Sequence, residues 1–374
     1  MRRTSLALLS VSLLLAACSG PVATQLPVLP TLPARTGAPA TPTAEATEMA
    51  SLPATGAPTT EPTEATTPAP TEEVTQPPSE STEPTTGASA APSYALPSPP
   101  LAVCGPITSL STKTPGRLTL STDNPAFPPW WGGDPTVQYP NEPAGGDDWE
   151  VSDPYSMEGF EGATAYAIAN AMGFTPDLID WIQNTVFAQS FAPGPKQFDF
   201  HMAQVSIRPK RALNVDFSDP YFDAVQSLLA LADNPITGAQ NINDLKAYKL
   251  GAASNTTSFD LIDQVIQPNS DPTVYPDNTA ALTALKNGQI DGIVVDLGTA
   301  FYMRDAQLAG DPAGQIVGQF SSALQTDEVG AVLQKDSPLT PCVNQAIAAI
   351  KANGTLQAIY DTWIVSGQNI PFLQ

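Results

Sequence analysis

The pattern of apolar and polar positions changes at about residue 100. Beyond it, short apolar runs typical of strands alternate with stretches of helical period. RLTLST, DLIDWI and FDFHMAQV predict strands, and FEGATAYAIANAMGF predicts a helix between the first two, because its apolar positions recur every three or four residues. The stripe expected on that helix consists of Phe160, Ala163, Ala167, Ile168 and Ala171.

A second set of elements follows. QSLLALA, YKLGAAS, IDGIVVD, QIVGQF and VGAVLQ predict strands, and TTSFDLIDQVI, NTAALTALKNG and LGTAFYMRDAQ predict helices. The helices PCVNQAIAAIKANG and TLQAIYDTWI close the chain. Strands and helices that alternate in two sets predict an α/β fold of two lobes, with the chain crossing between them.

The start of the chain predicts export. Arg2 and Arg3 precede an apolar run, residues 6–15, that is too short to span a bilayer, and small residues then lead to Cys18. This order resembles the lipobox of a bacterial lipoprotein signal peptide, in which cleavage leaves the cysteine as a lipid-modified N-terminus. Residues 1–18 would then be the signal peptide and Cys18 the membrane anchor. The alternative is an ordinary secretory signal with an incidental cysteine.

Residues 19–100 are rich in Pro, Thr, Ser, Ala and Glu, as in TTEPTEATTPAPTEEVTQPP. Such a segment cannot bury enough apolar surface to offset its chain entropy, and its prolines keep it extended. It therefore predicts a disordered tether that holds the domain formed by residues 101–374 away from the membrane.

Charge and cysteine content bear on the class of ligand and on disulfide formation. The chain has 37 Asp and Glu against 15 Lys and Arg, a net charge of -22, which argues against nucleic-acid binding. With Cys18 lipidated, Cys104 and Cys342 remain, and an oxidising compartment favours a disulfide between them over two free thiols. We expect no metal and no cofactor.

Positive charge is concentrated in SIRPKRALNVDFSDPY, where Arg208, Lys210 and Arg211 fall within four positions. An isolated cluster of this kind more often lies exposed on a surface turn than binds a ligand. The surrounding sequence changes that balance.

Several ordered blocks resemble the bacterial extracellular solute-binding proteins of family 3. They are TDNPAFPPW, GFEGATAYAIANAMGF, SIRPKRALNVDFSDPYF, NINDLKAYKLGAASNTTS, NTAALTALKNGQIDGIVVDLGTAFY and NQAIAAIKANGTLQAIYDTWI. The resemblance implies a two-lobed, hinged fold like that of type II periplasmic binding proteins. Lobe 1 would comprise residues 101–225 and 325–374, and lobe 2 residues 226–324.

The resemblance also implies a site for a zwitterionic amino acid. Arg211 occupies the position of the family's carboxylate-binding arginine, and its planar fork suits a carboxylate. Arg208 and Lys210 would be exposed to solvent. Ser206 would present an amide and a hydroxyl to the ligand. Thr256 and Thr257 precede a predicted helix, whose free N–H groups favour an anion, although either could simply cap that helix.

The α-amino group and the side chain of the ligand would contact acidic and aromatic residues. Asp296 matches the acid that binds the α-amino group, and Asp123 matches an acid near the ligand side chain. Phe127 and Phe187 would sandwich the ligand, although core packing is the alternative for each. Gln204 stands where small residues are common and would contact the ligand side chain. Trp130 and Trp131 are weaker candidates.

Two departures from the family pattern leave the ligand's identity open. Ala163 replaces an acid that many members carry in the first helix. An insertion at residues 132–159 separates the ligand loop from that helix and could form a lid or a surface flap. Its acids lack the spacing of a calcium-binding loop.

The resemblance implies a monomeric, extracytoplasmic protein that is lipid-anchored to the cell membrane and delivers an amino acid to the permease of an ABC importer. Two alternatives remain open. One is an enzyme resembling cyclohexadienyl dehydratases, which would keep the arginine for a carboxylate but would need a positioned acid or base. We expect no enzyme, because the only histidine, His201, belongs to a strand and no Ser-His-Asp set is evident. The other alternative is a sensor domain for a signalling partner.

Overall fold

The computed structural model describes residues 96–145, 148–325, 327–364 and 369–374. The expected signal peptide, the lipidated Cys18 and most of the expected tether lie outside the described residues. Within the described residues, no helix has the length and apolar character needed to cross a membrane.

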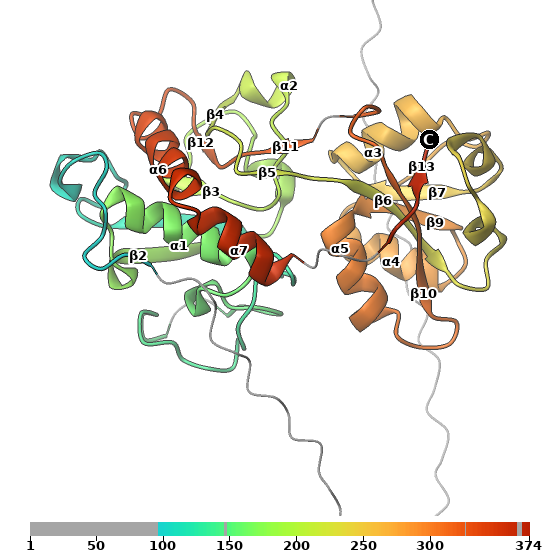
Figure 1. Cartoon of the computed structure of the whole chain (residues 1–374), viewed down its shortest axis with the longest axis horizontal. Coiled ribbons are helices and arrows are strands. Elements are labelled where there is room, and N and C mark those ends of the chain that lie inside the picture. Colours follow the sequence, from blue (N-terminus) through green and yellow to red (C-terminus); the bar gives the residue numbers. More distant parts are fainter. Residues whose placement is uncertain (1–95, 146–147, 326, 365–368) are drawn as a thin grey trace, which may run out of the picture. The chain divides into compact units, whose positions relative to one another are not determined.

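A five-stranded sheet forms the first core (Figure 1). Its strand order is β2-β1-β3-β12-β4, with β1 parallel to β2 and β3, and β12 antiparallel to β3 and β4. The strands are β1 (Leu118–Asp123), β2 (Ile179–Asn184), β3 (Phe200–His201), β4 (Val215–Phe217) and β12 (Val332–Gln334). This sheet confirms the predicted first α/β lobe.

Helices α1 (Phe160–Met172), α6 (Thr340–Ala352) and α7 (Thr355–Trp363) pack together beside this sheet, although α1 is far from the other two in sequence (Figure 1). All 13 residues of α1 are buried, so the expected amphipathic stripe is wrong. The helix is enclosed because α6 and α7 cover it, and the segment before β1 also bonds to its end, where the Leu101 N–H donates to the Asn170 carbonyl. Its start requires Gly159 (φ +84°), because a Cβ there would lie 2.4 Å from the Trp131 Cα.

A six-stranded sheet forms the second core, in the order β13-β10-β6-β9-β7-β8. Its strands are β6 (Gln226–Leu231), β7 (Leu250–Ala253), β8 (Thr273–Tyr275), β9 (Gly292–Asp296), β10 (Gly314–Phe320) and β13 (Phe372–Leu373). Helices α3 (Thr257–Leu261), α4 (Asn278–Lys286) and α5 (Leu297–Tyr302) follow β7, β8 and β9 respectively. Two separate sheets, each with its own buried cluster, confirm the two-lobed fold.

Short elements complete the chain. A two-stranded ribbon joins β5 (Phe222–Asp223) to β11 (Glu328–Val329), where the chain leaves the first sheet and returns to it. Helix α2 is a single turn (Pro209–Ala212). Further 3₁₀ turns are Ile107–Ser109, Pro154–Ser156, Pro176–Leu178, Phe187–Gln189, Pro235–Gly238 and Ile242–Ala247.

Several predicted elements are shorter than expected. The strand expected at 198–205 is reduced to β3, because the chain bends after it, where Ala203, Gln204 and Ser206 line the cavity described below. The helices expected at 256–266 and 297–307 both change to π-helical turns, Ile262–Ile266 and Met303–Gln307. Apolar period alone does not distinguish these hydrogen-bond patterns.

The end of the chain differs from the expected division into lobes, which assigned residues 325–374 to lobe 1. Phe372 and Leu373 pair in parallel with Gln319 and Phe320 of the second sheet. Leu373 is fully buried in the second core, and the burial of this apolar side chain accounts for the crossing.

A disulfide joins Cys104, ahead of β1, to Cys342 in α6, with a Cα–Cα distance of 5.7 Å. The pairing that the export argument favoured is therefore present. It closes a sequence separation of 238 residues and ties the start of the first lobe to the last helices of the domain.

Candidate functional site

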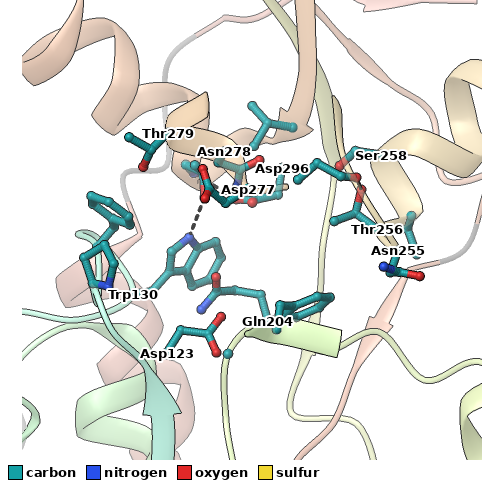
Figure 2. A pocket seen from close by; sticks show the side chains of 18 of the residues that line it. Asp123, Trp130, Gln204, Asn255, Thr256, Ser258, Asp277, Asn278, Thr279 and Asp296 are labelled. Atoms are coloured by element: carbon teal, nitrogen blue, oxygen red, sulfur yellow. Dashed lines mark hydrogen bonds between the residues drawn. The ribbon is translucent and has the colours of Figure 1, made fainter. Parts of the chain in front are cut away.

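One cavity of about 370 Å³ gathers the residues that the sequence predicted to face a ligand (Figure 2). All nine line it: Asp123, Phe127, Phe187, Gln204, Ser206, Arg211, Thr256, Thr257 and Asp296. They come from the end of β1 and the loop after it, the turns after β2, β3 and β7, helix α2, the start of α3 and the end of β9. Side chains at the carboxyl ends of strands meet here because this is where open α/β sheets leave a crevice.

Arg211 is the one cation among the described residues that line this cavity. It is 9% exposed, and its guanidinium donates to the Ser206 carbonyl at 2.7 Å and to the Asn255 carbonyl at 2.6 Å. The group also lies over the rings of Phe191 and Phe187, 4.4 and 5.6 Å from their centroids. Burial lowers the pKa of Arg211 to about 10, so it stays charged at neutral pH.

The two neighbouring cations do not line the cavity. Lys210 is exposed, as expected. The expectation for Arg208 is wrong: its side chain is only 28% exposed and lies 3.7 Å from the buried carboxylate of Asp327. A salt bridge between segments distant in sequence is not visible in a local charge pattern.

The turn between β7 and α3 is held by its own hydroxyls. The Thr256 Oγ1 accepts the Phe259 N–H at 3.2 Å and donates to the Ala253 carbonyl at 2.7 Å, so Thr256 caps the helix. The Thr257 hydroxyl donates to Asp327 at 2.9 Å and lies 3.4 Å from the Ser206 hydroxyl. Both threonines line the cavity while these bonds are in place.

Asp296 ends β9 and is the N-cap of α5, where its Oδ1 accepts the Thr299 N–H at 2.8 Å. Burial raises the pKa of Asp296 to about 6, against the lowering effect of the bond from Thr299. The carboxylate faces a cavity that holds one cation, Arg211, among its described lining residues.

Asp123 ends β1, and its side chain keeps 32% of its surface exposed, toward the cavity (Figure 2). Burial, and secondarily the charge of Glu161, raises the pKa of Asp123 to about 8. Among the described residues, the donors that approach its carboxylate are distant: the Asn184 Nδ2 lies 3.5 Å away and the His201 Nε2 3.9 Å away. His201 is fully buried, which lowers its pKa to about 3 and leaves it neutral.

The structure brings a Ser-His-Asp set together that the sequence analysis did not find. The Ser121 Oγ lies 3.1 Å from the His201 Nδ1, and Asp123 lies on the other side of the ring. Only Asp123 lines the cavity; Ser121 and His201 are 1% and 0% exposed on the adjacent strands β1 and β3. The potential nucleophile is therefore in the protein interior, where a substrate has no access.

Glu161 supports the site and was missed by the sequence analysis. It is fully buried in the first turn of α1, and its carboxylate accepts the Gln204 N–H at 2.8 Å, the Gln204 Nε2 and the Tyr221 hydroxyl. Burial raises the pKa of Glu161 to about 7. The sequence feature that could have identified Glu161 is its position as the one charged residue in the apolar helix FEGATAYAIANAM.

Gln204 is held in the left-handed backbone region (φ +49°), where side chains other than glycine are uncommon. Its bonds to Glu161 stabilise that conformation. This explains how a glutamine stands at a position for which the family resemblance implies a small residue.

Aromatic rings form part of the wall. Phe127 packs against Tyr302, with ring centroids 5.9 Å apart. Trp130 is 2% exposed, and its Nε1 donates to the Thr299 Oγ1 at 2.9 Å. Its ring covers Gly298, where a Cβ would come within 2.7 Å of the indole. Trp130, which the sequence ranked low, therefore connects the loop after β1 to the first turn of α5.

The insertion bonds to β2 and to Asn124, which directly follows β1. The Asn124 carboxamide donates to the Asp148 carbonyl at 2.9 Å and accepts the Glu150 N–H at 3.1 Å. The Gln183 Nε2 in β2 also donates to the Asp148 carbonyl, at 2.7 Å, and Trp149 is buried. This segment therefore positions the residue next to Asp123.

Within the residues that the structure describes, no group of three or more His, Cys, Asp or Glu residues could hold a metal ion. The chemistry available in the cavity is that of one cation, several carboxylates, hydroxyls and rings, which suits the binding of a small zwitterion.

Comparison with known proteins places the fold and the family. The glutamine-binding protein GlnH of a Bacillus subtilis ABC transporter is 31% identical over 172 residues, 44% of this chain and 58% of that protein. The L-cystine-binding protein TcyJ of Escherichia coli (strain K12) is 29% identical over 209 residues, 55% of this chain and 74% of that protein. The chain thus spans less than two thirds of the first of these relatives.

Solved structures show the same fold. An ancestral arginine-binding protein bound to arginine matches with a TM-score of 0.51 and 24% identity, over 67% of this chain and 99% of that one. An ancestral amino acid-binding protein, a precursor of cyclohexadienyl dehydratase, matches with a TM-score of 0.52 and 25% identity, over 67% and 96%.

A sequence model of the bacterial extracellular solute-binding proteins, family 3, matches residues 149–366, which include most of the cavity residues. Because this match covers more than half of the chain, the protein belongs to the bacterial extracellular solute-binding proteins, family 3.

Proposed function

We propose that this protein captures an amino acid in the cavity and delivers it to an ABC importer. The observation that carries the proposal is that Arg211 and Asp296, one cation and one carboxylate, line the same cavity. An amino acid brings a carboxylate and an ammonium group, and each loses its water on burial unless the protein supplies an opposite charge.

In this proposal the ligand carboxylate binds Arg211 and the Ser206 turn, with the threonines after β7 as further donors. The ammonium group binds Asp296. Phe127 and Phe187 contact the ligand from the wall of the cavity, and Gln204 and Asp123 contact its side chain. A ligand that touches residues from both lobes favours the state in which the lobes are closed on it.

The setting of the domain belongs to the same proposal. Residues 1–18 act as a lipoprotein signal peptide, Cys18 carries the lipid, and residues 19–100 form the tether. The domain of residues 101–374 acts as a monomer outside the cytoplasmic membrane and meets the permease there. Metabolic labelling with a radioactive fatty acid tests the anchor, because Cys18→Ala is expected to abolish incorporation.

A thermal-shift scan of the purified protein against the twenty amino acids tests the capture step. A ligand at a hundred times its Kd should stabilise the fold by roughly 2.7 kcal/mol, which raises Tm by several degrees. Arg211→Ala and Asp296→Ala should each abolish the shift. Lys210→Ala, an exposed cation beside Arg211, is the matched control and should retain it. No shift from any amino acid would contradict the proposal.

An enzyme is the second candidate, since one structure of similar fold is a precursor of cyclohexadienyl dehydratase. Asp123, whose raised pKa suits a general acid, is the residue that such an activity would use. We propose binding without chemistry, because Ser121 and His201 are buried behind Asp123. Turnover of a cyclohexadienyl acid that is lost in Asp123→Asn would overturn this.

A further inference from the structure

We propose that Arg208, which does not line the cavity, controls the affinity for an amino acid by neutralising the buried carboxylate of Asp327. This inference rests on the proposed function, in which Arg211 binds the carboxylate of the amino acid. The two arginines of SIRPKR then have different roles. Arg211 contacts the amino acid, and Arg208 is a positioning residue that acts through Asp327.

Asp327 is a buried carboxylate at the point where the chain returns from the second sheet to the first, directly before β11. It is 4% exposed and lines the cavity. One of its oxygens, Oδ2, accepts the Thr257 hydroxyl at 2.9 Å and the Gln226 Nε2 at 2.7 Å. Both donors are neutral, so they bind this carboxylate without cancelling its charge.

The other oxygen of Asp327 faces Arg208. This Oδ1 is buried and accepts no hydrogen bond from the residues that the structure describes. The Arg208 Nη2 lies 3.7 Å from it, too far for a hydrogen bond but within the range of an ion pair. Because a buried carboxylate is costly without an opposite charge, we identify Arg208 as the counter-charge of Asp327.

Asp327 lies near the carboxylate end of the proposed site. The Thr257 hydroxyl that it binds is 3.4 Å from the Ser206 hydroxyl, and the Ser206 carbonyl accepts a bond from Arg211. The pKa of Arg211 reflects the same proximity. Burial lowers this pKa most, the Asp327 carboxylate raises it, and the Arg208 guanidinium lowers it. An amino-acid carboxylate bound to Arg211 is therefore subject to both neighbouring charges.

The net charge at this end depends on Arg208. Arg211 supplies one positive charge and Asp327 one negative charge, so these two residues alone present no net charge to an incoming carboxylate. Arg208 adds a second positive charge and makes the end attractive to an anion. The cation that decides this balance thus lies outside the cavity.

Asp327 also removes one donor from the carboxylate end. Because an ionised carboxylate only accepts hydrogen bonds, the Thr257 hydroxyl donates to Asp327 and has no second hydrogen for the amino acid. The donors that remain at this end include Arg211, the Ser206 hydroxyl and backbone N–H groups. With fewer hydroxyl donors, binding depends more strongly on the net charge.

Isothermal titration of the purified protein with each of the twenty standard amino acids, one at a time and in 0.15 M NaCl, tests this inference. In Arg208→Gln, the uncompensated charge of Asp327 should raise the Kd roughly tenfold. The factor should be nearly the same for every amino acid that binds, because the effect acts on the carboxylate that all of them carry. Arg208→Lys retains the charge and should recover most of the affinity.

Removing the charge of Asp327 as well should rescue the variant. In Asp327→Asn, the amide oxygen can accept the bonds from Thr257 and Gln226, and the amide nitrogen replaces the oxygen that accepts none. The double variant Arg208→Gln/Asp327→Asn should therefore bind within about threefold of the native protein. A purely structural role of Arg208 would not produce this recovery.

Lys210→Gln is the matched control. It removes a positive charge from the same turn, but Lys210 is exposed and its charge is screened by water and salt. Its Kd values should stay within about twofold of the native ones. If Arg208→Gln fails to fold by circular dichroism, Asp327→Asn alone decides the question, since it increases the positive charge and should bind at least as tightly as the native protein.

The possible failures are distinguishable. An unchanged Kd in Arg208→Gln, an equal loss in Lys210→Gln, or a double variant without recovery overturns this inference and leaves the proposed function intact. Weaker binding by a folded Asp327→Asn also overturns it, because the negative charge would then hold the amino acid itself. If no amino acid binds to the native protein, the proposed function is wrong.

Discussion

The two ends of the cavity are built in opposite ways. At one end, the Arg211 guanidinium already donates to two carbonyls and lies against two rings, so its position is determined without a ligand. At the other end, the donors that the described residues offer to Asp123 are distant, and its pKa is raised. In the proposed function, the first end is preorganised for the carboxylate that every amino acid carries, whereas the second holds a carboxyl group with few protein partners among the described residues. We therefore expect the Arg211 end to contribute mainly to the affinity for amino acids and the Asp123 end to the choice among them.

The largest expected effect is at the preorganised end. Arg211→Ala should weaken amino-acid binding by about 2–5 kcal/mol, because it removes the partner of a buried carboxylate. Arg211→Lys keeps the charge but not the planar fork, so it should recover only part of this loss. Calorimetric Kd values measure both variants. If the lysine variant bound as tightly as the native protein, charge alone would account for this end.

The insertion should act on the other end. Asn124→Leu removes both bonds to the backbone of the insertion and leaves the Asp148 carbonyl and the Glu150 N–H without those partners, at a cost of about 1–3 kcal/mol in stability. Urea unfolding measures the loss. The affinity for the ligand should also fall, since Asn124 adjoins Asp123. An affinity unchanged in Asn124→Leu would show that the insertion does not position the ligand loop.

The free energy of unfolding should decrease by roughly 1–2 kcal/mol between pH 6.5 and pH 8 in the absence of ligand. The pKa values of Asp123 and Glu161 are raised on folding, to about 8 and about 7, so the folded state binds more protons than the unfolded state. Their contribution is complete below their unfolded pKa values and is lost as pH rises through the folded ones.

His201 acts in the opposite direction, but its lowered pKa affects stability only below about pH 6.5. Asp296, at about 6, is largely ionised across the upper window. Urea midpoints at pH 6.5, 7.25 and 8 measure the slope, and Asp123→Asn should flatten it. A stability that rises across this range would show that these carboxylates are better compensated than their surroundings indicate.

The smallest effect concerns Trp130. Trp130→Phe keeps an aromatic ring and removes the N–H that donates to Thr299, so we expect a loss of about 1 kcal/mol in stability or ligand affinity. Thr299→Val removes the other partner and provides the second half of a double-mutant cycle. Additive effects of the two substitutions would show that this bond contributes nothing of its own.

Much of the fold followed from local pattern. The strands β1, β2, β6, β7, β9 and β10 appear within a few residues of the apolar runs that predicted them, and helices α1, α4, α6 and α7 appear where the helical period predicted them. Local pattern failed where a distant segment decided the outcome. Leu373 joins the second sheet, and α1 is buried on every side, because segments far along the chain cover them.

In the site, too, local pattern predicted some features, and contacts between distant segments decided the others. A run of ordered motifs identified the nine predicted residues that line the cavity, since each stands at a fixed place relative to a strand end or a helix start. The sequence did not reveal that Glu161 holds Gln204, that Arg208 meets Asp327, or that Ser121 and His201 lie behind Asp123. These are contacts between segments far apart in the chain, and no periodicity records them.

What the sequence by itself determined is the alternation of strands and helices and the chemical kinds of residue that line the cavity. These follow from short-range preferences of backbone and side chain. Only the tertiary structure decided which of those residues keep a free charge, because burial and partners set the pKa of Asp123 and the orientation of Gln204. Desolvation and hydrogen bonding depend on neighbours in space, and the fold brings those neighbours together from segments far apart in the sequence.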